Sequence, residues 1–153
     1  MRLLFLSRGF GMSHAIRSWA LAAEVRARAP AAEIVHASYA DGLAGLNLVG
    51  QEALDLGLPP LGKDFRRIPA IGKLLRDLRP DAVVADEELL ALPVCELLGI
   101  RAIFVTNWLA PPRMERNIGY LMNATHVILA DCEDAFPVPP WLERVVKKGS
   151  KMR

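Results

Sequence analysis

A loop near the start of the chain carries the side chain best suited to acid–base chemistry. Residues 3–7 form a short apolar segment that predicts a strand, and the pattern Gly9-x-Gly11-x-x-His14 follows it directly. In α/β proteins, ligands bind where a strand ends and the next helix begins. A histidine side chain can exchange a proton in the physiological pH range, so His14 could act there as a base or donate a hydrogen bond. Alternatively, the glycines only form the turn and His14 lies on the surface.

The same loop offers further contacts to a ligand. Gly11 would let a ligand approach the backbone, and Ser13 would cap the helix and offer its hydroxyl. Arg17 lies one turn after His14 and would face the same opening, unless it is a solvated helix arginine. The pattern departs from the dinucleotide-binding fingerprint because His14 replaces the third glycine. Asp41, beyond the second predicted strand, keeps a nucleotide-binding hypothesis open.

Acidic residues follow a second predicted strand, at residues 82–85. Asp86, Glu87 and Glu88 come directly after it. The carboxyl ends of parallel strands meet at one edge of a sheet, so these carboxylates should lie at the edge that carries His14. There they could bind hydroxyls or orient the histidine. The alternative is that they charge the first turn of the following helix, where the helix dipole favours acids.

A third polar group follows the strand predicted at residues 101–106. Thr106, Asn107 and Trp108 stand at its end. An asparagine side chain offers both donors and acceptors to a polar ligand, and a tryptophan can stack on the face of a sugar. The alternative is a turn residue followed by a half-buried aromatic side chain.

The elements that must position these residues alternate along the chain. Strands are predicted at residues 3–7, 33–38, 82–85, 101–106 and 125–130, and helices at 13–29, 65–78, 88–98 and 112–123. Strands rich in Val, Ile and Leu that alternate with helices predict an α/β fold. We expect a mostly parallel sheet of about six strands with helices on both faces.

Some boundaries and faces are less regular. Residues 46–56 could form a short helix, although glycines weaken that pattern. The helix at 65–78 should break into two pieces at Pro69 and Gly72. In the helix at 13–29 one apolar face is predicted to be buried, and its members are Ile16, Trp19, Ala20, Ala23 and Ala27.

Composition limits the classes of protein that remain. The chain has 153 residues, of which 52% are hydrophobic and 24% charged, so one domain with a real core is expected. A formal net charge of +2 does not indicate a nucleic-acid partner. No apolar stretch approaches the ~20 residues of a membrane span. The two cysteines, Cys95 and Cys132, are expected to be reduced thiols in a cytoplasmic protein.

Several kinds of catalytic site are not indicated. The sequence has no metal-ligand spacing of His and Cys, no phosphate-binding P-loop and no serine-hydrolase motif. His36 and His126 lie in predicted strands, where packing or exposure is expected rather than catalysis. A basic amphipathic segment spans residues 63–79 and could lie against an anionic membrane surface. The alternative is a surface helix whose apolar stripe covers the sheet.

Three segments together resemble the nucleotide-sugar glycosyltransferases of the GT-B class. The first is Gly9-Phe10-Gly11-Met12-Ser13-His14-Ala15-Ile16-Arg17 after a strand. The second is Pro80-Asp81-Ala82-Val83-Val84-Ala85-Asp86, followed by a helix that ends in Leu97-Leu98-Gly99-Ile100-Arg101. The third is Thr106-Asn107-Trp108. The chain is most similar to the branch that includes the N-acetylglucosaminyl transferase of peptidoglycan synthesis.

This resemblance implies a division of labour between two Rossmann-like domains. One domain binds the acceptor, a small hydroxylated or lipid-linked molecule, and the other binds the nucleotide-sugar donor. Residues 1–146 would form the acceptor-binding domain, with 147–153 a solvated tail or the start of a linker. His14 would be the base, and no metal or cofactor is expected. The acceptor pocket would draw on the following residues: Gly9, Gly11, Ser13, Arg17, Asp86, Glu87, Asn107 and Trp108.

The chain departs from the family pattern in ways that shape the functional hypothesis. Ser13 stands where the family usually has glycine, Arg101 replaces a proline, and the donor-binding domain is not expected within these residues. The first hypothesis is therefore an acceptor-binding half, nearly inactive without a donor-binding domain or subunit. The second is a non-catalytic docking subunit of a two-chain glycosyltransferase, cytoplasmic and peripheral at the inner membrane face. The third is a small nucleotide-binding domain that uses Gly9 and Gly11.

Overall fold

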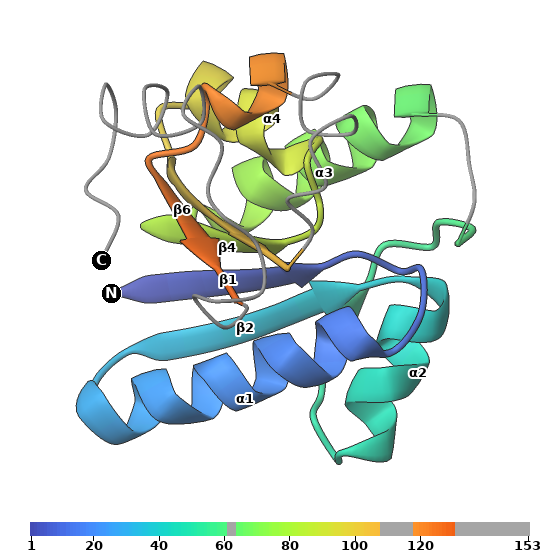
Figure 1. Cartoon of the computed structure of the whole chain (residues 1–153), viewed down its shortest axis with the longest axis vertical. Coiled ribbons are helices and arrows are strands. Elements are labelled where there is room, and N and C mark those ends of the chain that lie inside the picture. Colours follow the sequence, from blue (N-terminus) through green and yellow to red (C-terminus); the bar gives the residue numbers. More distant parts are fainter. Residues whose placement is uncertain (61–63, 108–117, 131–153) are drawn as a thin grey trace.

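A six-stranded parallel sheet lies between two layers of helices (Figure 1). The computed structural model describes residues 1–60, 64–107 and 118–130. Its elements are β1 (Arg2–Ser7), α1 (Ser13–Arg28), β2 (Glu33–Ser38), α2 (Ala40–Leu48), β3 (Leu54–Asp55), α3 (Asp64–Leu78), β4 (Ala82–Asp86), α4 (Ala91–Leu97), β5 (Arg101–Thr106) and β6 (His126–Leu129). The predicted α/β class, with a parallel sheet of six strands, is confirmed.

The order of the strands places a topological switch point at the centre of the sheet. The order is β3-β2-β1-β4-β5-β6, so β1 pairs with β2 on one side and with β4 on the other. The chain first builds outward from β1 through α1 and α2, and then crosses to β4 and builds in the other direction. This reversal is the switch point at which open parallel sheets bind ligands. It lies between the carboxyl ends of β1 and β4.

Each face of the sheet has its own apolar core. Leu4, Leu6 and Val83 face one side, where Ile71 and Leu75 of α3 and several residues of α4 cover them. On the opposite face lie Leu3, Phe5, Ala82, Val84 and Val105, with Ala22 of α1 packed against them. In Figure 1, α1 and α2 lie on one side of the sheet and α3 and α4 on the other. Alternation along β1 therefore supplies both cores from one strand.

The buried face of α1 differs from the predicted one. Ala15, Ser18 and Ala22 are buried, whereas Trp19 is 36% exposed. The large side chains come from the sheet, so the helix can approach only where its own side chains are small. The apolar pattern that begins at Ile16 pointed to a different face, and that prediction was wrong.

Two helices also depart from prediction. Residues 46–56 do not form a helix of their own, because α2 spans Ala40–Leu48 and the strand Leu54–Asp55 follows. The glycines of α2 permit close packing, since a Cβ on Gly45 would lie 3.1 Å from the Cβ of Met12. Helix α3 continues through Pro69 instead of breaking. Pro69 lies in the second turn, so the one hydrogen bond it removes is at the start of the helix.

The remaining boundaries follow the prediction more closely. Helix α4 covers Ala91–Leu97 within the predicted 88–98, and Gly99 follows with a φ of 67°. Half of the helix predicted at 112–123 lies outside the described residues, and the described half is helical at 118–121. Within the described ranges, no helix combines the length and the apolar character that crossing a bilayer requires.

Candidate functional site

Four neighbouring strands end in a buried polar residue. Ser38 of β2, Ser7 of β1 and Asp86 of β4 have no exposed surface, and Thr106 of β5 is 1% exposed. Ser7 is the register partner of Asp86 across the switch point. Burying polar groups costs free energy unless they are hydrogen-bonded, so this edge needs a network of partners.

Asp86 is the centre of that network. Arg17 of α1 donates from Nε to Asp86 Oδ2 at 2.8 Å, and Arg17 Nη2 donates to Asp86 Oδ1. Ser18 Oγ lies 3.4 Å from Asp86 Oδ2, and His14 Nδ1 lies 3.2 Å from Oδ1. The predicted convergence of His14, Arg17 and Asp86 at one edge of the sheet is thus present in the structure.

Arg17 holds the Asp86 carboxylate in place. The hydrogen bond to Asp86 is the largest of the effects that raise the pKa of the Arg17 guanidinium above its ordinary value. The two parallel N–H bonds fix both carboxylate oxygens, a geometry that only arginine provides. The oxygen that accepts from Arg17 Nη2, Oδ1, also faces the imidazole of His14. The carboxylate can therefore orient the histidine while its charge is balanced.

The position of the proton on His14 follows from its two neighbours. Asp86 Oδ1 lies 3.2 Å from His14 Nδ1, and Arg17 Nη2 lies 3.3 Å from the same nitrogen. A neutral imidazole offers only a donor or an acceptor at Nδ1, so one of these contacts is mismatched. We assign the proton to Nδ1, because a charge-assisted bond to the carboxylate is the stronger of the two. Nε2 then carries a lone pair. The His14 side chain is 17% exposed.

The glycines of the loop have different roles. A Cβ on Gly9 would lie 2.3 Å from Cδ2 of Tyr39, so Gly9 is required for close packing against that ring. Gly11 has a φ of 74° and open space around the position of a Cβ. The Gly11 N–H donates to Oδ2 of Asp41 at 3.2 Å, which ties the loop to α2. Asp41 thus has a partner within the fold.

Ser13 does not cap α1 as predicted. The N-cap residue is Met12, and no side chain makes a capping hydrogen bond. Ser13 is the first residue of the helix, and it is exposed at the same end as His14. Its hydroxyl remains accessible from this edge, so its predicted ligand contact stays a prediction.

Glu87 links the ends of β4 and β5. Its φ of 55° lies in the left-handed region, which is uncommon for a residue other than glycine. Glu87 Oε1 accepts from the hydroxyl of Thr106 and from the backbone N–H of Asn107, the latter at 3.3 Å. Asn107 Oδ1 is buried and has no hydrogen-bond partner among the described residues. Trp108 lies outside the described residues.

Glu88 belongs to a second buried cluster that the sequence did not reveal. Glu88 Oε2 accepts from the hydroxyl of Tyr39 at 2.7 Å and from Arg67 Nη2 at 3.2 Å. Arg67 also donates to the Tyr39 hydroxyl, and its guanidinium lies over the Tyr39 ring at 5.3 Å from the centroid. Burial is the main cause that raises the pKa of Glu88, and it also contributes most to raising the pKa of Tyr39 to about 12.

Neither of the two interpretations of Glu87 and Glu88 from the sequence predicted that Glu88 would be buried with Tyr39 and Arg67. Glu87 and Glu88 precede α4, which begins at Ala91 and has no acidic residue in its first turn. Arg67 lies in the segment predicted to be a basic surface, yet it is only 9% exposed. The sequence offered one signal for this cluster. Tyr39 directly follows β2, so it had to lie at the carboxyl edge of the sheet, where Glu88 also lies.

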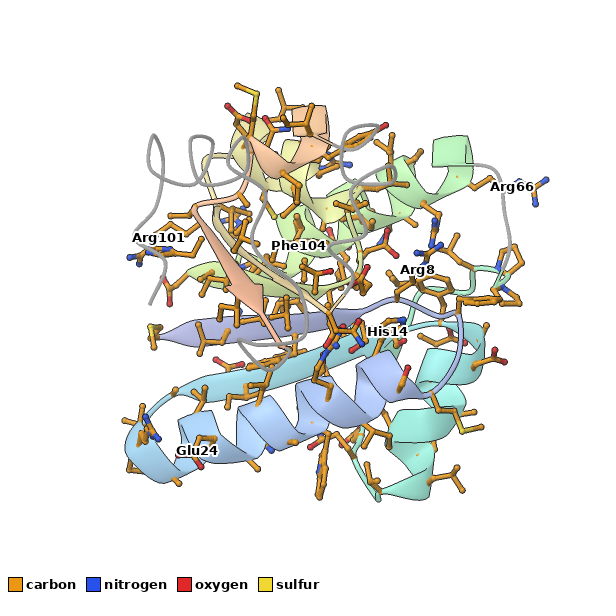
Figure 2. All side chains as sticks on the ribbon, in the orientation of Figure 1. Arg8, His14, Glu24, Arg66, Arg101 and Phe104 are labelled. Atoms are coloured by element: carbon orange, nitrogen blue, oxygen red, sulfur yellow. The ribbon has the colours of Figure 1, made fainter. Side chains whose placement is uncertain are left out.

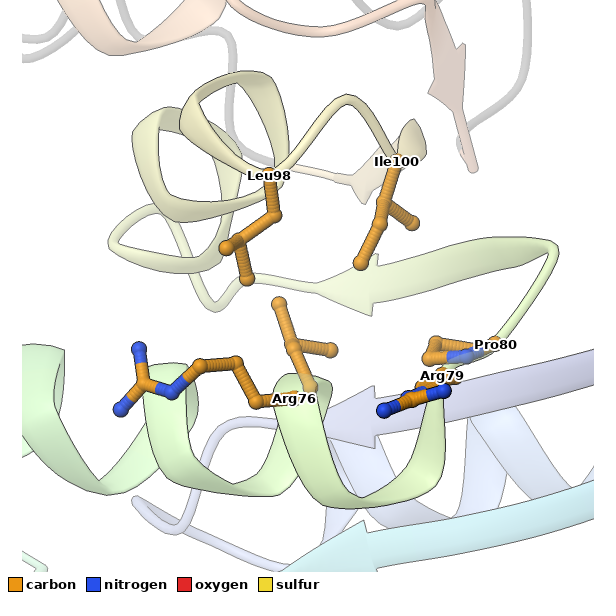
Figure 3. A pocket seen from close by; sticks show the side chains of 6 residues that line it. Arg76, Arg79, Pro80, Leu98 and Ile100 are labelled. Carbon is orange, nitrogen blue, oxygen red and sulfur yellow. The ribbon is translucent and has the colours of Figure 1, made fainter.

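Within the described residues, hollows lie at both edges of the sheet. A pocket of about 200 Å³ opens at the carboxyl edge between Arg8, Arg67, Glu87, Glu88 and Tyr120. A larger hollow of about 370 Å³ lies beyond the end of α3, next to the start of β5 (Figure 3). Its floor is apolar, with Leu75, Leu98 and Ile100, and Arg76 and Arg79 flank it. Only the first pocket adjoins the Asp86 network.

Three other reactive side chains among the described residues, His36, His126 and Cys95, lie outside the Asp86 network. His36 is 1% exposed within β2, and His126 is exposed on β6. Cys95 is buried, and burial raises the pKa of its thiol to about 12, so it is not a nucleophile at neutral pH. Cys132 lies outside the described residues. No group of three or more His, Cys, Asp or Glu within the described ranges could hold a metal ion.

Comparisons with known proteins identify the fold. No protein-family model and no curated sequence matches the chain. UDP-GlcNAc 2-epimerase from Neisseria meningitidis, bound to UDP-GlcNAc, is similar with a TM-score of 0.65 and 17% identity, over 82% of this chain and 39% of that one. MurG from Acinetobacter baumannii is similar with a TM-score of 0.62 and 14% identity, over 91% of this chain and 43% of that one. UGT89C1 from Arabidopsis thaliana, complexed with UDP, is similar with a TM-score of 0.61 and 13% identity, over 97% of this chain and 47% of that one.

These neighbours are GT-B glycosyltransferases and UDP-GlcNAc 2-epimerases. The resemblance predicted from the motifs is therefore confirmed at the level of fold. The chain spans less than half the length of each of the three proteins.

Proposed function

We propose that this chain is the acceptor-binding half of an enzyme that transfers a sugar from a nucleotide-sugar to a hydroxyl acceptor. The observation that carries the proposal is the contact between His14 Nδ1 and Asp86 Oδ1 at 3.2 Å, at the switch point of the sheet. A histidine backed by a buried carboxylate is a general base in many unrelated enzymes. The likeness in fold to glycosyltransferases supports the same assignment.

The transfer step uses the free nitrogen of His14. As the acceptor oxygen attacks the anomeric carbon of the sugar, its proton moves to His14 Nε2. The bond between that carbon and the nucleoside diphosphate breaks, and the diphosphate leaves with the electron pair. Asp86 stabilises the imidazolium that forms at Nδ1–H, and Arg17 keeps Asp86 aligned. Ser13, Gly11, Glu87, Asn107 and Trp108 would shape the surroundings of the acceptor.

The proposal also concerns where the nucleotide-sugar donor binds. The solved neighbours are more than twice as long as the stretch they share with this chain. We propose that a further domain or a partner subunit binds the nucleotide-sugar as co-substrate. The chain by itself should then show little or no transfer.

The experiment that tests this function starts from the protein in its native cells. The protein is captured through its amino-terminal segment, its intact mass is measured, and the captured sample is assayed with labelled nucleotide-sugars. The variant His14→Gln should lower kcat by about 10²–10⁴-fold. His126→Gln is the matched control, because His126 is exposed on β6, away from the Asp86 network. Equal activity of the two variants would reject His14 as the base.

An epimerase is the second candidate, because UDP-GlcNAc 2-epimerase is among the structural neighbours. The same sample distinguishes the two reactions. A transferase releases the nucleoside diphosphate and requires an acceptor, whereas an epimerase returns an isomeric nucleotide-sugar without one. Isomerisation of UDP-GlcNAc in the absence of any acceptor would favour the epimerase.

A docking subunit at a membrane is the third candidate, and the hollow in Figure 3 favours it. Arg76 and Arg79 are exposed beside its apolar floor, and Leu97, which precedes Leu98 in the sequence, is 85% exposed. Cations beside exposed apolar side chains fit an anionic lipid surface. The double variant Arg76→Glu/Arg79→Glu should abolish sedimentation with anionic liposomes. Arg26→Glu/Arg28→Glu, with the same change of charge on α1, should not. Equal sedimentation of both variants would reject this surface.

A further inference from the structure

The pocket of about 200 Å³ at the carboxyl edge is lined mostly by charged side chains. It lies on the side of the sheet that α3 and α4 cover, whereas His14 and Arg17 come from α1 on the other side. Two arginines, Arg8 and Arg67, and two carboxylates, Glu87 and Glu88, contribute to its wall. Which of these charges is available to a ligand depends on the partners that each already has.

Both carboxylates have donors within the fold. Glu87 accepts from the Thr106 hydroxyl and the Asn107 N–H, and Glu88 accepts from Tyr39 and Arg67. Arg67 is engaged by the same cluster. Hydrogen bonds within the fold therefore engage three of the four charged side chains in the wall of the pocket.

Arg8 is the charged side chain of this wall that makes no side-chain hydrogen bond within the described residues, and its charge opposes the rise in the pKa of Glu88. Its Nε is buried and has no hydrogen-bond partner among the described residues. Its backbone N–H donates to the carbonyl oxygen of Asp86 at 3.0 Å, which anchors the residue at the switch point. A buried guanidinium N–H without an acceptor is costly, and an anionic oxygen is its best partner.

We propose that this pocket binds an anionic group, a phosphate monoester or a carboxylate, through the guanidinium of Arg8. The planar fork of an arginine matches two oxygens of either group. The volume of about 200 Å³ exceeds by several times the ~30 Å³ that one water molecule occupies, so the group and its first attached atoms fit. The hydroxyl of Tyr120, on the same wall, is a further donor.

The position of the pocket connects it to the transfer chemistry. Arg8 bonds the backbone of Asp86, while His14 contacts the side chain of the same residue. Figure 2 shows Arg8 and His14 at the same end of the sheet. An acceptor could therefore hold its anionic group at Arg8 and present a hydroxyl toward His14. That the anion belongs to the acceptor rests on the proposed function, whereas anion binding itself does not.

The test measures binding to the chain directly, by NMR of the arginine Nε–H groups. Glucose 6-phosphate, glucuronate and glucose are titrated as a phosphate monoester, a carboxylate and a neutral sugar. We expect saturable binding of at least one anion, a shift of the Arg8 signal and no binding of glucose. Arg8→Gln should weaken that binding by about 10–100-fold, and Arg8→Lys should weaken it less. Arg101→Gln, at the opposite end of the sheet, should have no effect.

The outcomes separate this site from the proposed function. Binding of neither anion to the folded chain, equal binding of glucose, or binding unchanged in Arg8→Gln would overturn the anion site. The variant His14→Gln should bind the anion normally. If anion binding depends on Arg8 while transfer does not depend on His14, the site stands and the proposed function falls. The preferred anion identifies the chemical class of the ligand.

Discussion

The two edges of the sheet bury very different chemistry. At the carboxyl edge, Ser7, Ser38 and Asp86 are completely buried, and hydrogen bonds link Asp86 to α1 and Ser38 to the carbonyl of Ser7. At the amino edge, the charges remain at the surface. Arg2 Nε pairs with Glu33 Oε2 at 2.9 Å, with side chains that are 40% and 55% exposed. Both edges are held by polar contacts, but only the carboxyl edge buries whole polar side chains such as Ser7, Ser38 and Asp86.

The difference shows which contacts serve the fold and which prepare a site. Surface pairs such as the one between Arg2 and Glu33 contribute about 0–1 kcal/mol, because water screens them and their side chains must be ordered. A buried carboxylate brings no clear gain in stability over an apolar core, yet it holds its neighbours in one geometry. Asp86 is therefore better explained by the orientation of His14 and Arg17 than by stability.

Removal of the charge at Asp86 should have the largest effect on stability. Asp86→Asn leaves the half-buried guanidinium of Arg17 without its counter-charge, and we expect a loss of about 3–5 kcal/mol in the free energy of unfolding. Asp81→Asn is the matched control at the amino edge, where the carboxylate accepts an exposed bond from the Arg2 N–H. Its cost should be below about 1 kcal/mol. Urea denaturation of both variants measures the difference, and equal losses would refute the contrast between the edges.

The sequence predicted those parts of the site that depend on strand ends. Parallel strands bring their carboxyl ends to one edge, so the meeting of His14 with Asp86 needed only the correct order of elements. The cluster of Tyr39, Arg67 and Glu88 was missed because its members come from three elements. Their partnership depends on how α3 packs over the sheet, and no local pattern encodes that packing.

The same distinction explains the error in α1. Hydrophobicity favoured the face with Trp19, but the sheet already supplies large side chains such as Leu3 and Phe5 on that side. Complementary volume therefore selected the face with Ala15, Ser18 and Ala22. A periodic pattern reports which side chains are apolar, whereas packing depends on what the partner surface offers.

The titration of His36, a histidine that is 1% exposed, should have the second largest effect. Both ring nitrogens are buried without a hydrogen-bond partner among the described residues. Burial, aided by the charge of Arg26, lowers the pKa of His36 from 6.5 to about 4. The unfolded chain therefore binds a proton below pH 6.5 that the folded chain does not. Above pH 6.5, His36 should therefore not make the free energy of unfolding depend on pH. Between pH 6.5 and pH 4, it should lower that free energy by about 3 kcal/mol.

The variant His36→Leu isolates that contribution. It removes the titrating group, so its free energy of unfolding should fall less between pH 7 and pH 4 than that of the parent chain. His126→Leu, exposed on β6, should keep the acid sensitivity of the parent. Denaturant titrations at a series of pH values provide the comparison. Identical pH profiles for His36→Leu and the parent would show that the histidine is not buried in its neutral form.

The two loop glycines test how tightly the carboxyl edge is packed. A Cβ on Gly9 would lie 2.4 Å from the backbone oxygen of Tyr39, which has little freedom to move, so Gly9→Ala should cost about 3 kcal/mol. Gly11→Ala meets no atom within 4 Å and strains only the φ of 74°, at about 1 kcal/mol. Thermal unfolding of both variants measures the two losses of stability. A larger loss for Gly11→Ala would mean that the loop packs differently at Tyr39.

A smaller effect than that of Gly9→Ala is expected from the hydroxyl of Tyr39, which bridges Arg67 and Glu88. Tyr39→Phe keeps the ring under the guanidinium and leaves Arg67 paired with Glu88 at 3.2 Å, so only the hydrogen bonds of one hydroxyl are lost. The expected loss is about 1–2 kcal/mol, from denaturant unfolding. Tyr120→Phe, at a residue that is 36% exposed, should lose almost nothing. A loss at Tyr39 as small as that at Tyr120 would mean that water replaces the hydroxyl. The cluster of Tyr39, Arg67 and Glu88 would then be as hydrated as the amino edge. The contrast between the two edges of the sheet would be confined to Asp86 and its partners.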